Sequence, residues 1–219
     1  MKYRIACCLG AVLVGATPVV NASKEGIYVG VGITSTSYHG DSSDSFVRAV
    51  DDERVTGGRA EVGYVWDLGK PGGFHLGVVG AYDSLGKVSG STDNGINTVD
   101  VSLDASALSV YFLIEQEIAS WVDFVFKVGP SLVDYRVKSC CSAISNRAII
   151  DDKETKGASA VVIGFTFFPT ENIGIELAGQ AISWFTGDFR DVEDSDTFYD
   201  YVDSLVTART LSASVQYRF

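Results

Sequence analysis

The end of the chain, Leu211–Phe219, reads LSASVQYRF and alternates between apolar and polar residues. One side of an extended backbone here would carry Leu211, Ala213, Val215, Tyr217 and Phe219. Successive side chains of a strand point to opposite faces, so the stretch predicts a strand with one apolar and one polar face. It ends on an aromatic residue, which favours a strand that closes a transmembrane barrel and leaves no unpaired edge.

Seven earlier segments alternate in the same way and predict seven more strands. These begin near Ile27, Gly58, Phe74, Thr98, Trp121, Val161 and Ile173. Long polar stretches, predicted to be loops, follow the first, third, fifth and seventh strands (38–54, 84–97, 138–156 and 187–204), and short connections follow the others. The pattern predicts an all-β fold, an eight-stranded antiparallel up-and-down transmembrane β-barrel with short periplasmic turns and long extracellular loops.

Aromatic residues near both ends of the strands support a membrane location. One group lies next to short connections or the C-terminus: Trp66, Phe74, Trp121, Phe167, Tyr217 and Phe219. The other lies next to long stretches: Tyr38, Tyr82, Tyr135, Trp184 and Phe185. Two such groups predict aromatic belts at two membrane–water interfaces.

Two of the predicted strands change parity along their length. In the fourth, Val99 to Ala105 use odd positions, whereas Leu108 to Phe112 use even ones. Either a bulge shifts the phase of this strand, or its lower half is apolar on both faces. In the fifth, a similar change follows Pro130, which cannot donate a ladder hydrogen bond, so a bulge is expected there.

The first residues predict export. Lys2 and Arg4 precede an apolar run, 5–20, and small residues precede Ser23. This order is typical of a secretory signal peptide, predicted as residues 1–22, which leaves 23–219 as the barrel domain of the outer membrane of a Gram-negative bacterium. The alternative is a membrane anchor, but the run is short for a spanning helix and Pro18 interrupts its end.

The chain is acidic, with 17 basic and 28 acidic residues and a formal net charge of −11. This balance argues against nucleic acid as a partner, and against binding of anionic lipid through the charge of the whole chain.

Charged residues also occupy the parity opposite to the apolar face of the strands. They are Arg59, Glu61, Asp83, Asp123, Lys127 and Glu176. Eight strands enclose an interior that side chains can fill, and charges inside it must pair to offset the loss of bulk water. We therefore predict a lumenal network of ion pairs.

Other candidate chemistry is sparse, and no cofactor is predicted. Cys140 and Cys141 are adjacent, so they are expected to be loop thiols, exposed or paired with each other, or to link to another chain. An acidic cluster near the C-terminus comprises Asp191, Glu193, Asp194 and Asp196. This cluster is either a solvated loop tip or a divalent-cation site that would bridge to lipopolysaccharide phosphates.

Enzymatic residues are not arranged convincingly. His39 and His75 are the two histidines, and neither begins the His-x-Ser pattern of one type of outer-membrane deacylase. His39, Asp41 and Ser42 have the composition of an acyltransferase site, but such clusters are common in polar loops. We therefore predict a protein that is not an enzyme, with His75 in the lower lumen.

Three stretches, FVFKVGPSLVDYRV (124–137), PTENIGIELAGQAI (169–182) and SVQYRF (214–219), make the chain similar to the small eight-stranded outer-membrane barrels. That family includes the OmpA transmembrane domain, OmpX and the opacity proteins. The resemblance implies that Lys127 and Glu176 contribute to a charged plug. It also implies that Tyr217 and Phe219 carry the signal for the barrel-assembly machinery.

The function expected from the sequence is therefore structural or surface-interacting and adhesin-like, with a plugged lumen. A narrow porin-like channel and a lipid A-modifying enzyme are the alternatives. The expected partners are outer-membrane lipid, lipopolysaccharide and an unknown molecule at the loops.

Overall fold

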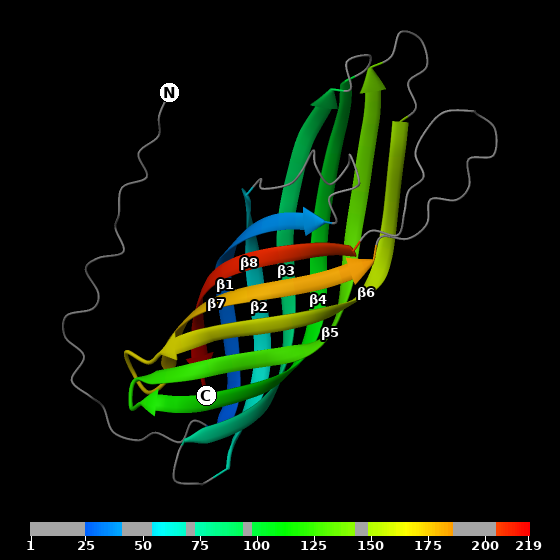
Figure 1. Cartoon of the computed structure of the whole chain (residues 1–219). Coiled ribbons are helices and arrows are strands. Elements are labelled where there is room, and N and C mark those ends of the chain that lie inside the picture. The colour runs from blue at the N-terminus through cyan, green and yellow to red at the C-terminus, as the bar shows by residue number, and fades with distance from the viewer. Residues whose placement is uncertain (1–24, 41–53, 69–72, 94–97, 143–148, 186–204) are drawn as a thin grey trace, which may run out of the picture.

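Eight strands form a closed barrel in the computed structural model, which describes residues 25–40, 54–68, 73–93, 98–142, 149–185 and 205–219. The strands are β1 (Gly26–Gly40), β2 (Arg54–Asp67), β3 (Phe74–Asp93), β4 (Thr98–Ala119), β5 (Val122–Ser142), β6 (Ile149–Phe167), β7 (Ile173–Phe185) and β8 (Leu205–Arg218). Each strand pairs antiparallel with the next, and β8 pairs with β1 (Figure 1). The predicted fold class is confirmed. No helix within these residues is long and apolar enough to span a lipid bilayer.

The last strand closes the barrel. Its ladder with β1 runs from Tyr28 opposite Arg218 to Gly40 opposite Val206. Leu211 is 64% exposed and Phe219 is 72% exposed, whereas the alternating polar side chains of β8 are buried inside. The parity read from the sequence therefore matches the faces of this strand.

Strands β3 to β6 are longer than the sequence pattern predicted, and they project above the other strands at the upper end of Figure 1. Most of the predicted loops 84–97 and 138–156 are strand, which leaves 94–97 and 143–148 as connections. Residues 38–40 and Arg54, also predicted to be loop, belong to β1 and β2. Hydrogen bonds to neighbouring strands stabilise these polar segments despite their turn-like composition.

One irregularity occurs where β3 leaves the barrel. The register with β4 shifts between Ser84 and Gly86, and Leu85 is buried. Gly86 has a φ of 82°, in the left-handed region that suits glycine at a bulge. The bulge allows β3 to continue upward as part of the projecting sheet.

The parity change in β4 comes from a change of surroundings. Leu103 and Tyr111 both point inward and are buried, and the register with β5 is the same above and below Val110 and Tyr111. Val110 and Phe112 are exposed on the outer face, but higher on this face lie polar residues such as Asp104. The lower half of β4 is thus apolar on both faces, as the second alternative predicted.

The bulge predicted at Pro130 is absent. The register of β5 with β6 continues through Gly129, Pro130 and Ser131, and the register with β4 is the same above and below this point. Lys127 and Val133 both face inward. The prediction was wrong because the apolar face moves from the outside to the inside at this level, without a shift of the backbone.

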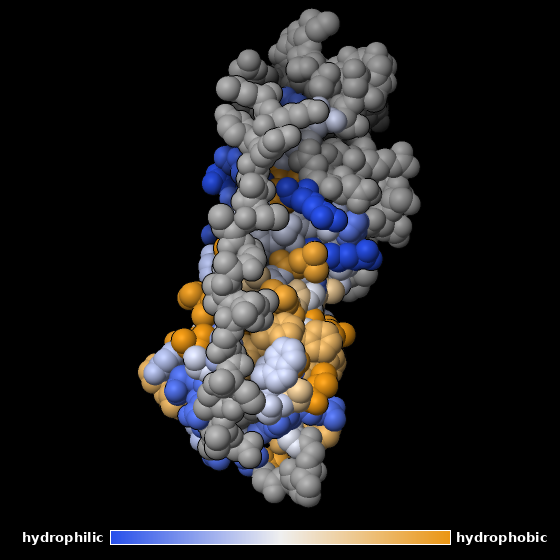
Figure 2. Space-filling view, turned by 90° about the vertical axis from the view of Figure 1, so that its left-hand side faces the viewer, coloured by the Kyte–Doolittle hydropathy of each residue, from blue (hydrophilic) through white to orange (hydrophobic). Residues whose placement is uncertain are grey.

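An apolar belt surrounds the lower part of the barrel, and Figure 2 shows it bordered by hydrophilic residues above and below. Its exposed members include Ile27, Val29, Val31, Ile33, Val62, Val78, Leu108, Val110, Phe112, Ile163, Phe165, Leu177, Leu211 and Val215. Such side chains would be costly in water and are suited to lipid. The belt identifies β1 to β8 as strands that cross a membrane.

The two predicted aromatic groups have different outcomes. At the lower end, Trp66, Phe74, Trp121, Tyr217 and Phe219 are exposed. At the upper end Tyr82 is exposed, but Tyr38, Tyr135 and Trp184 are at most 2% exposed and lie inside the barrel. The lower group therefore matches an interfacial belt, whereas the upper prediction was wrong for these three residues, which fill the interior.

Candidate functional site

The middle of the lumen holds an ionic cluster centred on Lys127. Its Nζ lies 2.8 Å from Glu176 Oε2 and 3.0 Å from Glu61 Oε2, and all three side chains are buried. The side-chain amide of Gln216 donates to Glu61 Oε1 (3.0 Å) and to Glu176 Oε2 (2.7 Å). Strands β2, β5, β7 and β8 each contribute one of these residues, so the cluster connects opposite walls of the barrel.

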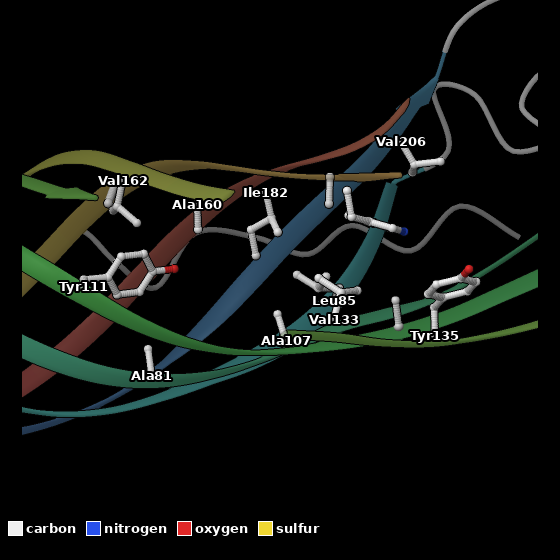
Figure 3. Close-up of a cluster of buried hydrophobic side chains, with 14 of the residues drawn as sticks. Ala81, Leu85, Ala107, Tyr111, Val133, Tyr135, Ala160, Val162, Ile182 and Val206 are labelled. Atoms are coloured by element: carbon white, nitrogen blue, oxygen red, sulfur yellow. The ribbon is translucent and has the colours of Figure 1, made fainter. Parts of the chain in front are cut away.

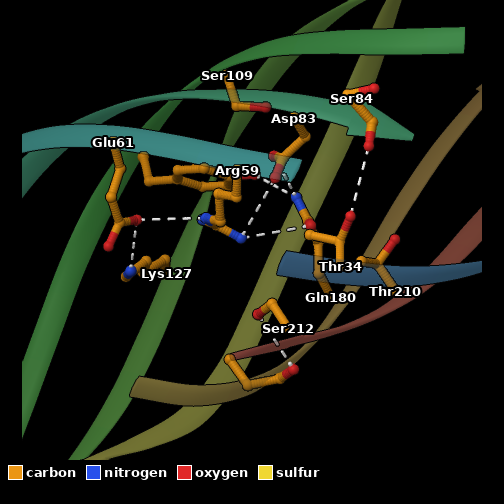
Figure 4. A network of polar contacts seen from close by, with 12 residues as sticks. Thr34, Arg59, Glu61, Asp83, Ser84, Ser109, Lys127, Gln180, Thr210 and Ser212 are labelled. Atoms are coloured by element: carbon orange, nitrogen blue, oxygen red, sulfur yellow. Dashed lines mark hydrogen bonds and ion pairs between the residues drawn. The ribbon is translucent and has the colours of Figure 1, made fainter. Parts of the chain in front are cut away.

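Arg59 extends this cluster upward (Figure 4). Its guanidinium lies 3.4 Å from Glu61 Oε2 and 3.7 Å from Asp83 Oδ1. Gln180 donates to Asp83 (3.1 Å) and to the hydroxyl of Tyr111 (2.8 Å). Five of the six charged residues predicted to form a network are therefore joined in one cluster.

The sixth, Asp123, lies in a separate cluster at the lower end. It is fully buried, and its charge acts on Arg218. Arg218 Nη2 lies 2.7 Å from Glu115 Oε1, and the guanidinium carbon lies 4.7 Å from the ring centroid of Phe168. This arrangement closes the lower mouth with a cation held between carboxylates and an aromatic ring.

Sequence reasoning missed several members of these clusters, among them three with polar or charged side chains on β4 and β8. Gln216 and Arg218 lie on the polar face of the last strand, so its alternation alone would have placed them inside the barrel. Glu115 lies near the end of β4, which continues to Ala119, where the sequence suggests a short connection to the next strand. Once the full length of β4 is known, the alternation of inward and outward residues places Glu115 inside the barrel.

Above the ionic cluster the lumen is filled by apolar side chains (Figure 3). Leu85, Val133 and Ile182 have no exposed surface, and Trp184 is 1% exposed. The Tyr38 hydroxyl donates to the Leu85 carbonyl oxygen at 3.1 Å. The described interior therefore has an ionic layer below and an apolar layer above, and side chains of both layers are packed out of contact with solvent.

The remaining candidates are scattered. His39 lies on the outer surface at the upper rim, where Ser37 Oγ is 3.4 Å from its Nε2, and Asp41 and Ser42 lie outside the described residues. His75 is buried in the lower lumen, 3.6 Å from Asp67, as expected. The histidines therefore occupy different regions of the barrel.

Two further predictions concern possible ligands. Asp191, Glu193, Asp194 and Asp196 lie outside the described residues. The backbone of Cys140 and Cys141 belongs to β5 and pairs with β4, so the prediction of loop thiols was wrong about the loop. Among the described residues, no group of three or more His, Cys, Asp or Glu is arranged to hold a metal ion.

Residues 5–219 match the family model described as outer membrane protein beta-barrel domain. The chain belongs to this family. Membership of the outer membrane protein beta-barrel domain family agrees with the apolar belt and places the protein in the outer membrane. No curated protein matches the sequence.

Several solved structures of outer-membrane proteins resemble the chain at low similarity. Ail, the attachment invasion locus protein of Yersinia pestis, is 15% identical, and the match covers 88% of this chain and 99% of Ail with a TM-score of 0.46. Neisserial surface protein A is 14% identical over 88% and 97% of the two chains, with a TM-score of 0.48. The outer membrane protease OmpT of Escherichia coli is 9% identical over 93% and 100%, also with a TM-score of 0.48. Likenesses this distant concern the fold alone.

Proposed function

We propose that this protein is a non-conducting outer-membrane barrel that presents the projecting strands β3 to β6 to molecules outside the cell. The observation that carries the proposal is the filled lumen, in which an apolar layer lies over the Lys127 cluster. Ions that crossed the barrel would have to break buried ion pairs and then pass through an apolar layer. Both steps are unfavourable, because each separates a charge from its compensating partner or from water.

The projecting sheet supports a role in surface interaction. Adjacent strands place Lys87 opposite Asp104, Asp104 opposite Arg136, and Arg136 opposite Lys153. All four residues are exposed on the outer face, above the apolar belt. A rigid sheet with charges of both signs is suited to selective contacts, because its orientation is fixed by the barrel.

A non-enzymatic role is part of the proposal. Within the described residues His39 and His75 lie on the outer rim and in the lower lumen, so the two do not form one acid–base site. A narrow channel and a lipid A-modifying enzyme are the competing functions.

The proposal includes export with cleavage before Ser23 and insertion that depends on the C-terminal strand. Tyr217 and Phe219 pack against each other with ring centroids 5.0 Å apart, at the lower edge of the belt. This exposed aromatic pair is suited to recognition by the assembly machinery before the strand closes the barrel.

Planar-bilayer recording of the folded, purified protein tests the closed lumen. We expect no steady single-channel current in symmetric salt, because both layers must open before ions can pass. Bilayers that receive the same detergent without protein provide the control. Reproducible current steps that depend on the protein would contradict the proposal and favour the channel.

A further inference from the structure

The outer wall of the barrel contains a groove at the upper rim, with a volume of about 570 Å³. Its lining residues come from strands that are neighbours across the closing seam: Ser35, Ser37, His39, Arg54, Val161, Ile163, Gly179, Gln180, Ala181, Arg209, Thr210 and Leu211. The groove is separate from the lumen, because Ser37, Ala181 and Leu211 belong to the outward parity of their strands.

Two arginines flank a single serine in this groove. Ser37 on β1 pairs with Arg54 on β2 on one side and with Arg209 on β8 on the other. Adjacent strands are about 4.8 Å apart, so the two arginine backbones are about 10 Å apart and both side chains can reach the space over Ser37. Both are exposed on the outer face.

Two basic residues of the upper strands, unlike these arginines, have an acidic neighbour. Arg136 faces Asp104 across its ladder, and Lys156 forms a 3.0 Å pair with Glu154. In the described part of the chain, no ion pair involves Arg54 or Arg209. Two neighbouring like charges repel each other, so the pair is better explained by an anion that both can bind.

The height of Arg54 and Arg209 relative to the apolar belt indicates which anion they bind. On β8, Leu211 is 64% exposed and lies one outward position below Arg209. On β1, Ile33 is the uppermost exposed apolar residue and lies two outward positions below Ser37. The guanidinium groups therefore lie just above the hydrocarbon level, where lipid headgroups are found.

Below the arginines, the groove has small residues and apolar walls. Gly179 and Ala181 on β7 are exposed, and Val161, Ile163 and Leu211 border them. A Cβ added at Gly179 would meet nothing closer than the Ile163 carbonyl oxygen at 4.0 Å, so the space above it is open. The shape and polarity suit an acyl chain, with a phosphate above it.

We propose that this groove binds a phosphorylated lipid of the outer leaflet, with Arg54 and Arg209 on one phosphate group and an acyl chain over Gly179 and Ala181. Guanidinium groups bind phosphate through charge-assisted and often bidentate hydrogen bonds. The net charge of the chain argues against binding of anionic lipid through the charge of the whole chain. A local pair of arginines that has no carboxylate partner among the described residues can still bind an anion at its own position. The inference uses the position of the membrane boundary on the outer wall of the barrel. It does not depend on whether the lumen conducts ions.

Native mass spectrometry of the folded protein in detergent micelles tests the arginines, with bis-phosphorylated lipid A as the probe. We expect a bound-lipid peak for the wild type and at least about tenfold weaker binding for the double variant Arg54→Gln/Arg209→Gln, because two charge-assisted contacts are lost. The matched control, Lys87→Gln/Lys153→Gln, removes the same charge from the outer face of the projecting sheet. It should bind within about twofold of the wild type.

Substitution of Gly179 tests the proposed position of the acyl chain. Gly179→Leu should fill the groove and weaken lipid A binding, while Gly80→Leu serves as its control. Gly80 is also outward, and a Cβ there has its nearest neighbour at 3.9 Å, the Val62 carbonyl oxygen. Both variants should fold, which resistance of the folded form to SDS can verify.

Any of four results would count against the proposal. One is equal lipid binding by the wild type and the arginine double variant, and another is an equal loss in the lysine control. The third is displacement of lipid A by an equal concentration of inorganic phosphate, which would indicate an anion site without a lipid. Dephosphorylated lipid A should bind no better to the wild type than to the double variant, and a difference there would also count against the assigned phosphate contact.

Discussion

Lys127 is the residue on which the stability of the lumenal cluster depends most. Its ammonium group is shared by Glu61 and Glu176, and none of the three side chains is more than 1% exposed. Removal of one partner from a buried ion pair is far more harmful than removal of both, because an uncompensated charge remains. At this scale Lys127 is the central residue, since each carboxylate depends on it.

The variant Lys127→Gln should therefore lower the free energy of unfolding by about 3–5 kcal/mol. Urea unfolding in lipid vesicles, followed by tryptophan fluorescence, measures the change. The control Lys156→Gln breaks the partly exposed pair with Glu154 and should cost less than about 1 kcal/mol. Equal losses in the two variants would show that burial does not set the strength of the cluster.

Above the membrane, Glu154 provides a test by titration. The Tyr135 hydroxyl donates to Glu154 Oε2 at 2.7 Å, and this hydrogen bond, together with Lys156, holds the pKa of Glu154 below its ordinary value. A lowered folded-state pKa means that the contact stabilises the fold above the ordinary pKa. That contribution is lost as the pH falls through the lowered pKa.

The variant Tyr135→Phe should raise the pKa of Glu154 toward its ordinary value, because the largest cause of the shift is removed. An NMR titration of side-chain carboxyl groups measures the shift directly. An unchanged Glu154 titration would mean that the hydroxyl does not bind its carboxylate in solution.

At the scale of the element, β4 passes through two environments on one face. Val110 is 53% exposed within the belt, and Ser106 lies four residues away on the same face, above the belt. The outer face must therefore be apolar over one length and polar over the next.

The variant Val110→Lys should destabilise the barrel by about 2–4 kcal/mol, whereas Ser106→Lys should cost at most about 1 kcal/mol. Unfolding in vesicles would measure both values on the same strand and face. Similar costs at the two positions would place the upper membrane boundary above Ser106.

The sequence predicts the eight strands and their faces well, but it predicts their lengths poorly. Alternation identifies the inward charges of β2, β5 and β7, because period two is a local property. It fails for the upper parts of β3 and β5, where polar residues such as Ser89 and Lys138 resemble a loop. Their pairing with Ser102, near the start of β4, helps to keep them extended, and such pairing is not visible in one segment.

At the scale of the whole molecule, the belt and the projecting sheet are separable. Gly86 pairs with Ala105 and Tyr135 pairs with Glu154, so each hairpin can be shortened at a paired position. The lumenal clusters and the belt lie below these pairs and should be unaffected.

A variant in which two-residue turns replace 87–104 and 136–153 should still form a folded, SDS-resistant barrel. If the projecting sheet is the contact surface that we propose, bacteria that display this variant should attach less to other surfaces than bacteria that display the full-length protein. A version with only the 94–97 connection exchanged serves as the control. Failure of the shortened variant to fold would show that the projecting sheet stabilises the barrel, and undiminished attachment would exclude the sheet as the contact surface.

The seam between β1 and β8 also determines the order of events in folding. Tyr28 is among the first residues of the barrel and Arg218 is the penultimate residue of the chain, yet the two are paired. Contacts this distant in sequence carry a large loop-closure entropy, which slows folding. The cylinder cannot close until β8 has been synthesised, so β1 must wait for a partner strand that comes nearly 200 residues later.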